Sequence, residues 1–165
     1  MNDEKPIRPI SRTNAVVRKS GPELKVIRLK GGQVMNCIVL SDHLHGFEIH
    51  WDHASRRSEP HMEDEATCEG CLGKKPRYWK YYLHVWSTHH AQCFVELTQE
   101  ASEQLTSLLE AEETYRGVPL EIKRTSANNG RLFVAMSNSL AQRAHLPVGK
   151  DPEPTLRLLW RWGRK

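Results

Sequence analysis

The sequence has no long apolar run and no mark of a secreted or membrane protein. None of its hydrophobic stretches approaches the roughly 20 residues that a membrane-spanning helix requires. The first residues, 1–5, are polar and charged and lack the apolar core of a secretory signal. We therefore expect a cytoplasmic protein that does not engage a membrane.

Cysteine is also scarce, with four residues in a chain of 165. Cys68 and Cys71 form one C-x-x-C pair, whereas Cys37 and Cys93 lie inside apolar, strand-like runs. This distribution does not fit a disulfide framework and favours a reduced, metal-binding pair. A redox dithiol is the alternative, but redox pairs open a helix after a strand in thioredoxin-like folds, and no such pattern surrounds Cys68.

The common motifs of catalysis are absent as well. The sequence has no G-x-G-x-x-G loop, no Walker A pattern and no Ser or Cys nucleophile in a readable triad context. The zinc-deaminase signature fails because Asp52 stands where H-x-E requires Glu, and Thr67 precedes Cys68 instead of Pro. We therefore predict a protein that is not an enzyme and has no small-molecule substrate; a metallo-hydrolase is the least favoured reading.

What is present is an ordinary globular composition, with 38% hydrophobic and 27% charged residues. The formal net charge of +4 permits a polyanionic partner without requiring one. Length and composition predict one domain with tails. We expect a flexible leader at 1–22, a folded domain at 23–137, and a linker with a basic, Trp-containing C-terminal tail at 138–165.

Alternating apolar positions predict a mainly β domain. One helix of about 15 residues is expected after Thr98, which can cap its N-terminus. The 33–40 and 46–51 runs read as one long strand bent around Gly46. The expected strands are 24–29, 33–51, 77–86, 92–97, 118–124 and 131–136, and an Asn-Gly hairpin loop is expected at 126–130.

This order favours the OB-fold, a five-stranded, partly open Greek-key barrel. The helix lies between strands 3 and 4, and a polar segment at about 50–76 is inserted between strands 1 and 2. Other small α+β arrangements share parts of the order. A loop of about 25 residues without structure of its own is unusual in a compact domain, and a bound metal would explain it.

The inserted segment holds candidate metal ligands. Nine histidines occur in the chain, most of them between residues 43 and 90. A tetrahedral zinc site takes four thiolate or imidazole ligands and leaves no open position for catalysis. We predict one structural zinc bound by His50, His61, Cys68 and Cys71, with His53 as the alternative to His50.

The strand after this segment is rich in rings. Alternation turns Trp79, Tyr81, Leu83 and Val85 toward the core and the rings and cations between them toward solvent. Such a surface stacks bases and neutralises phosphates, although single rings in it could instead cover the ends of the barrel. The predicted nucleic-acid-binding residues are Tyr78, Lys80, Tyr82, Trp86, Phe94, Lys123, Arg124, Arg131 and Phe133.

These features resemble a known domain across about residues 33–137. An OB-fold with a zinc knuckle between its first two strands is similar to the zinc-containing DNA-binding domain of the replication protein A large subunit. That domain uses four cysteines, whereas this chain would use two cysteines and two histidines. The His50-Trp51, C-x-x-C, 81–85, 96–98 and Arg116-Gly117 series is also similar to small bacterial and mobile-element proteins.

The resemblance implies a protein that binds single-stranded nucleic acid, DNA before RNA, through the face of the ring-rich strand. A bacterial single-strand-binding protein ends in an acidic tail that recruits partners, whereas this chain ends on a basic Trp-Arg-Trp segment. That tail could be a last strand, a nucleic-acid arm or a docking site for a protein partner. The alternative function is a zinc-stabilised adaptor subunit of a larger nucleoprotein complex.

Overall fold

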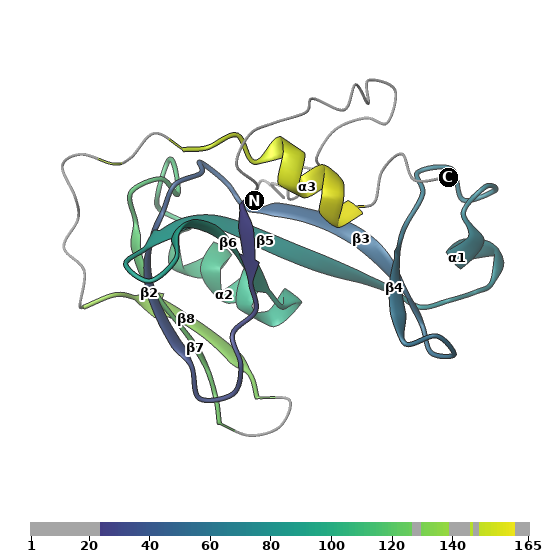
Figure 1. Ribbon diagram of the computed structural model, residues 1–165, viewed down its shortest axis with the longest axis horizontal. Helices are drawn as coiled ribbons and strands as arrows, with labels where there is room; N and C mark the ends of the chain where they lie inside the picture. Colours follow the sequence, from purple (N-terminus) through teal and green to yellow (C-terminus); the bar gives the residue numbers. More distant parts are fainter. Residues whose placement is uncertain (1–23, 127–129, 139–145, 147–148, 161–165) are drawn as a thin grey trace.

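A computed structural model describes residues 24–126, 130–138, 146 and 149–160 (Figure 1). The predicted leader at 1–22 lies outside the described residues. So do part of the predicted hairpin loop at 126–130 and parts of the predicted linker and tail at 138–165, including Trp162.

The described residues form eight strands and three helices. The strands are β1 (Lys25–Ile27), β2 (Val34–Val39), β3 (His45–Asp52), β4 (Arg57–Pro60), β5 (Arg77–Ser87), β6 (Ala91–Leu97), β7 (Pro119–Arg124) and β8 (Leu132–Met136). The helices are α1 (Glu69–Leu72), α2 (Gln99–Leu108) and α3 (Glu153–Trp160).

All eight strands belong to one mixed sheet. Its neighbours run in the order β1-β6-β5-β2-β7-β8, with β3 beside β5 and β4 beside β3. The β1–β6 pair is parallel and the others are antiparallel. The predicted mainly β class is confirmed, but the described strands form an open sheet and not the closed five-stranded barrel expected from the sequence.

Strands β2 and β3 share one edge of β5. The pairs Ile38–Trp86 and Val39–Val85 join β2 to the end of β5, while β3 pairs with its first half, from His45–Tyr82 onward. The two strands therefore behave as one interrupted strand, as the sequence predicted. The break lies at 40–44, so Gly46 is inside β3 and not at the bend.

The polar segment at 52–76 has more structure than the sequence indicated. Strand β4 pairs with β3 as a hairpin, from Asp52–Arg57 to Ile49–Pro60, and α1 follows it. Residues of β4 are exposed or half-buried on both faces, so the strand carries no apolar alternation. In Figure 1 this hairpin and α1 stand at one end of the molecule, away from β7 and β8.

The main core lies between the sheet and α2. Leu83 and Val85 of β5 are fully buried, as the alternation predicted, and Leu105 of α2 packs into the same cluster. Thr98 caps α2 by accepting a hydrogen bond from the Ala101 N–H at 3.2 Å, also as predicted. The helix covers ten residues instead of about 15.

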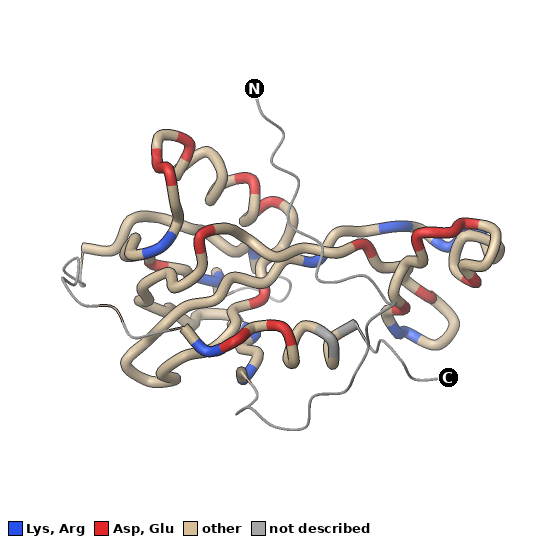
Figure 2. Tube along the Cα trace, turned by 90° about the horizontal axis from the view of Figure 1, so that it is seen from above, with Lys and Arg blue, Asp and Glu red and all other residues tan. Residues whose placement is uncertain are grey.

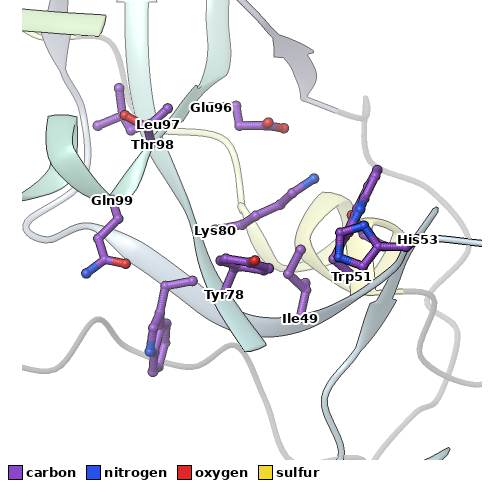
Figure 3. A pocket seen from close by; sticks show the side chains of 11 residues that line it. Ile49, Trp51, His53, Tyr78, Lys80, Glu96, Leu97, Thr98 and Gln99 are labelled. Atoms are coloured by element: carbon purple, nitrogen blue, oxygen red, sulfur yellow. The ribbon is translucent and has the colours of Figure 1, made fainter. Parts of the chain in front are cut away.

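A second apolar cluster covers the opposite face of β5 and β6. Tyr82 and Phe94 are 2% and 0% exposed and pack with Leu156 of α3. The Leu24 N–H also donates to Thr155 Oγ1 at 2.8 Å, which ties α3 to the start of the domain. The prediction that Tyr82 and Phe94 form an exposed stacking surface is therefore wrong, because a helix from the predicted tail covers them. Beyond α3 the same face stays open around Tyr78 (Figure 3).

Charge is distributed unevenly over the fold. Figure 2 shows acidic residues along α2 and the turn after it, whereas charges of both signs surround the β3–β4 hairpin and α1. A polyanion would therefore be repelled from the α2 side. Within the described ranges, no helix is long and apolar enough to cross a membrane.

The outer edge of β8 is capped by a side chain instead of another strand. Gln104 of α2 accepts a hydrogen bond from the Val134 N–H at 3.0 Å and donates one to the Leu132 carbonyl oxygen at 3.5 Å. An exposed strand edge is a site of unwanted pairing, and these contacts satisfy it.

We expect Gln104→Ala to lower the free energy of unfolding by about 1–3 kcal/mol, because it leaves two half-buried backbone groups of β8 without their partner. Chemical denaturation of the variant and of Glu103→Ala, at an exposed position of the same helix, measures this. Equal midpoints for the two variants would contradict the capping role.

Candidate metal centre

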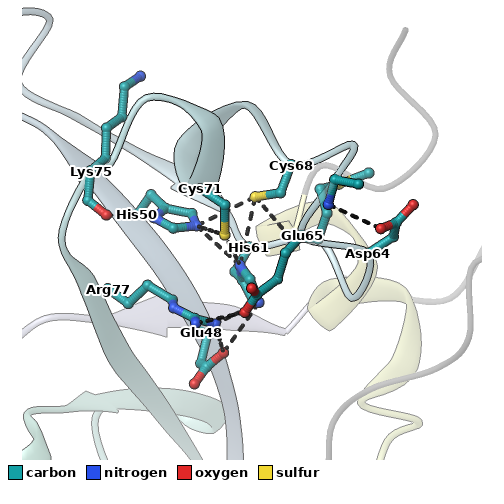
Figure 4. Close-up of polar contacts among 11 residues, drawn as sticks. Glu48, His50, His61, Asp64, Glu65, Cys68, Cys71, Lys75 and Arg77 are labelled. Atoms are coloured by element: carbon teal, nitrogen blue, oxygen red, sulfur yellow. Dashed lines mark hydrogen bonds and ion pairs between the residues drawn. The ribbon is translucent and has the colours of Figure 1, made fainter.

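Four side chains from three separate segments converge at the base of the β3–β4 hairpin (Figure 4). His50 lies in β3, His61 directly follows β4, and Cys68 and Cys71 flank and enter the short helix α1. One ligand atom from each residue lies within 4.8 Å of all the others. The residues predicted as ligands are therefore the ones that the structure brings together, and they could hold one metal ion.

The separations within this cluster are short and even. His50 Nε2 lies 3.0 Å from His61 Nδ1, and 3.4 and 3.5 Å from the sulfurs of Cys68 and Cys71. His61 Nδ1 lies 3.6 and 3.5 Å from the same two sulfurs. His53, the alternative ligand, is exposed, lies against Trp51 and is not part of the cluster.

Gly70 makes room for the His50 ring. A Cβ atom at this position would lie 2.3 Å from both Cγ and Cδ2 of His50, closer than non-bonded atoms can approach. Gly70 has no left-handed backbone conformation, so its role is to provide space and not backbone freedom. His50, 1% exposed, thereby packs against Gly70 of α1.

Backbone groups orient two of the ligands. The Lys75 carbonyl oxygen can only accept, so the His50 Nδ1–H donates to it at 3.0 Å and Nε2 is left with its lone pair facing the cluster. The Met62 N–H donates to the Cys68 sulfur at 3.4 Å. Both contacts fix a ligand in the form that binds metal.

Charged side chains surround the outer nitrogen of His61. Arg77 Nη1 lies 3.0 Å from His61 Nε2, and Glu48 Oε2 lies 3.5 Å from it. Burial, followed by the charge of Arg77, holds the pKa of His61 below its usual range and so favours the neutral imidazole. When Nδ1 ligates a metal, Nε2 carries the proton and can donate it to the Glu48 carboxylate. The Arg77 guanidinium can only donate, so its hydrogen bond to Nε2 belongs to the form in which Nε2 accepts.

The two thiols differ in their surroundings. Burial raises the pKa of the Cys68 thiol, but hydrogen bonds from the backbone of Met62, Cys71 and Gly70 and from the Cys71 thiol outweigh it, so the pKa is lowered overall. Burial and then the neighbouring Cys68 raise the pKa of Cys71. A thiolate pair of this kind is stabilised when a cation lies between the sulfurs.

Sequence reasoning missed the residues around the ligands. Glu48 and Arg77 meet at His61 only because β3 pairs with β5, which sets His50 opposite Arg77. Lys75 contributes its carbonyl oxygen from the turn after α1, and its ammonium group pairs with Glu59 at 3.0 Å. These contacts follow from the register in which β3 pairs with β5, and no local sequence pattern predicts that register.

A cleft of about 510 Å³ lies on the outer face of β3 and β5, and its lining includes Ile49 and Trp51, the chain neighbours of His50 (Figure 3). Tyr78, 51% exposed, lies in it beside the half-buried Trp51 and Lys80. Trp51 was not among the predicted binding residues, although it follows His50 directly. Figure 3 shows its side chain beside that of His53.

The other predicted nucleic-acid-binding residues lie elsewhere. Trp86 is half-buried at the far end of β5. Lys123 and Phe133 are cross-strand neighbours on β7 and β8, and both are exposed. Arg124 donates to the Gly130 carbonyl oxygen at 2.8 Å, and Arg131 lies 3.5 Å from Glu100. The exposed residues of the predicted surface therefore lie in two areas, one on β5 and one on β7 and β8, with β2 between them.

No protein-family model, curated protein or solved structure matches this chain. The geometry of its own residues therefore carries the functional argument.

We expect Gly70→Ala to lower metal affinity by roughly 10–100-fold, the usual effect of losing a contact that orients a metal ligand. All four ligands remain, but the added methyl group displaces the His50 ring. Competition with a chelating metal indicator measures the change. The control is Gly73→Ala, where a Cβ would approach its nearest neighbour only to 3.2 Å; equal affinities in the two variants would refute this role of Gly70.

Proposed function

We propose that this protein binds single-stranded nucleic acid, preferentially DNA, without catalysing a reaction, and that one structural zinc ion supports its binding surface. Three observations support the proposal: the ligand geometry, the strand arrangement, and an exposed ring beside a cation in a cleft on the outer face of the sheet.

The ligand set favours zinc. With Zn–N distances of about 2.0–2.1 Å and Zn–S distances of about 2.3 Å, tetrahedral ligand atoms are separated by about 3.3–3.8 Å. The nitrogen–sulfur separations of 3.4–3.6 Å agree with this, and the nitrogen–nitrogen separation of 3.0 Å is slightly short. Four protein ligands close the coordination sphere, which supports a structural role.

The strand arrangement supports a relationship to the OB-fold. Of the interrupted strand, β2 lies between β5 and β7 and β3 pairs with β5. The helix α2 follows β6, and β7 and β8 form the last hairpin. We propose that the domain is an opened OB-fold in which α2 fills the gap between β6 and β8. The metal knuckle then occupies the position that it has in the replication protein A domain that the sequence resembles.

The observation that carries the function is the exposure of Tyr78 next to Trp51 and Lys80. Half of the Tyr78 surface is open to solvent, in a cleft of about 510 Å³ that also contains a second ring and a cation. Rings beside cations bind single strands by stacking on bases and neutralising phosphates. Lys123 and Phe133 are a predicted second contact area on β7 and β8.

We expect the full-length protein to bind labelled oligodeoxythymidylate more tightly than duplex DNA, with an affinity that falls as salt rises. Tyr78→Ala should weaken this binding by about 1–3 kcal/mol, the contribution of one stacked base. Fluorescence anisotropy measures both effects, and oligouridylate in parallel tests the preference for DNA.

The matched control is Leu108→Ala, at an exposed apolar position on α2, which should bind like the wild type. Normal binding by Tyr78→Ala would contradict the stacking role. Absence of single-strand binding by folded, metal-loaded wild-type protein would contradict the proposed function.

A second candidate function is a zinc-stabilised adaptor within a larger nucleoprotein complex. The observation in its favour is the exposure of large apolar side chains on separate surfaces, with Leu72 of α1 66% exposed and Met136 45% exposed. A stable, salt-insensitive protein complex combined with no intrinsic nucleic-acid affinity would favour this function.

A further inference from the structure

A second groove, of about 750 Å³, lies between the β3–β4 hairpin and α3. Its floor is apolar and aromatic, formed by Phe47, Ile49 and Tyr82, and Leu158 and Leu159 of α3 line it on one side. On the side of the hairpin it is lined by Arg56 and Arg57. Phe47, Ile49 and Tyr82 are themselves buried, so the groove offers its cations and not a stacking surface. Cations along one rim are suited to a nucleic-acid strand whose phosphates face that rim.

The charge of this groove is not balanced by its own acids. Arg28 is paired with Glu96 at 2.8 Å, and the one carboxylate in the lining, Glu59, is paired with Lys75 at 3.0 Å. Among the described residues, no carboxylate lies within ion-pair distance of the other three cations, Arg56, Arg57 and Lys80. The groove therefore has a positive surplus that a polyanion would complement.

The turn that presents these arginines is fixed by a local hydrogen-bond network. Asp52 accepts from the Ala54 N–H at 3.1 Å and from the Ser55 hydroxyl at 2.8 Å. The Ser55 hydrogen bond is the largest cause that lowers the pKa of Asp52. Arg56 follows with a left-handed backbone (φ 53°), and Arg57 pairs with Asp52 to begin β4. The two arginines thus lie at the end of an ordered hairpin.

The metal centre anchors the base of the same hairpin. His50 lies in β3, where it pairs with Glu59 of β4, and His61 directly follows β4. The backbone N–H of His61 also donates to the backbone carbonyl oxygen of Glu48 at 3.1 Å. One ligand lies in β3 and another directly after β4, so that a bound ion would hold the two strands together.

The groove continues into the Tyr78 cleft. The two hollows share four lining residues: Ile49, Trp51, Ser58 and Lys80. A nucleic-acid strand that stacks on Tyr78 would therefore pass Trp51 and Lys80 and reach Arg56 and Arg57 without leaving the surface. Arg56 and Arg57 were not predicted from the sequence, because they lie in the polar segment and belong to no ring-rich strand.

We propose that the β3–β4 hairpin is a phosphate-binding arm, in which Arg56 and Arg57 contact the backbone of a single-stranded nucleic acid that lies between the hairpin and α3. This inference rests on the proposed function and specifies where the strand runs. Each arginine contributes one phosphate contact, so both set the salt dependence of binding.

The test compares metal-loaded, full-length variants by anisotropy with labelled oligodeoxythymidylate over a range of salt concentrations. Removing both arginines, as Arg56→Asn with Arg57→Gln, should weaken binding on the order of tenfold and lower the slope of log affinity against log salt by about 1.4, or about 0.7 per lost contact. Asn is chosen at position 56 because it tolerates a left-handed backbone.

The charge-matched control is Lys25→Gln with Lys30→Gln, two exposed cations outside the groove, which should leave the slope unchanged. A third variant, Lys123→Gln with Arg131→Gln, tests the competing area on β7 and β8. Metal content and thermal midpoints of all variants should match the wild type, because the substituted side chains are exposed.

Three results would contradict the phosphate-binding role of the hairpin. They are an unchanged salt slope in the arginine variant, an equal loss of affinity in the Lys25 and Lys30 control, and a loss of affinity confined to the Lys123 and Arg131 variant. The last result would leave the proposed function intact and would place the bound nucleic acid on β7 and β8. Absence of binding by the wild type would instead refute the proposed function itself.

Discussion

The convergence of two imidazoles and two thiols is the constraint on which the outer part of this structure depends. The segment 52–76 buries few apolar side chains, so packing alone gives it little stability. Four residues that could hold one metal ion converge there, with His50 and His61 at the base of a hairpin and Cys68 and Cys71 around α1. A metal ion bound by these four residues would convert a polar loop into a rigid projection, in the way that small zinc modules fold.

The two faces of the sheet have different roles. The inner face packs against α2 and forms the main core, with Leu83 and Leu105 fully buried. The outer face is covered at its centre, where α3 buries Tyr82 and Phe94, and open at its end, where Tyr78 and the hairpin lie. Two hollows that share Trp51 and Lys80 occupy this open end. The binding surface that we propose is therefore the part of the sheet that α3 leaves uncovered.

The sequence predicted local features better than long-range ones. The metal cluster was predictable because ligand type and the C-x-x-C spacing are local, and the alternation in β5 correctly assigned each side chain to a face. The burial of Tyr82 was not predictable, because the helix that covers it lies about 70 residues further along the chain. The Leu-rich pattern of that helix does not reveal which surface it packs against. The pairing of β4 with β3 was hidden because both of its faces are polar. The capping of the outer edge of β8 depends on one side chain, Gln104, and no sequence pattern signals that contact.

Native mass spectrometry of the purified full-length protein tests the central claim most directly. The account predicts a chain that carries one zinc ion, with a mass equal to protein plus zinc minus two protons, because both cysteines bind as thiolates. It also predicts that this adduct is lost from the His50→Ala variant. A folded wild-type chain that carries no metal after exposure to zinc, or that keeps its zinc when His50 is replaced, would contradict the account.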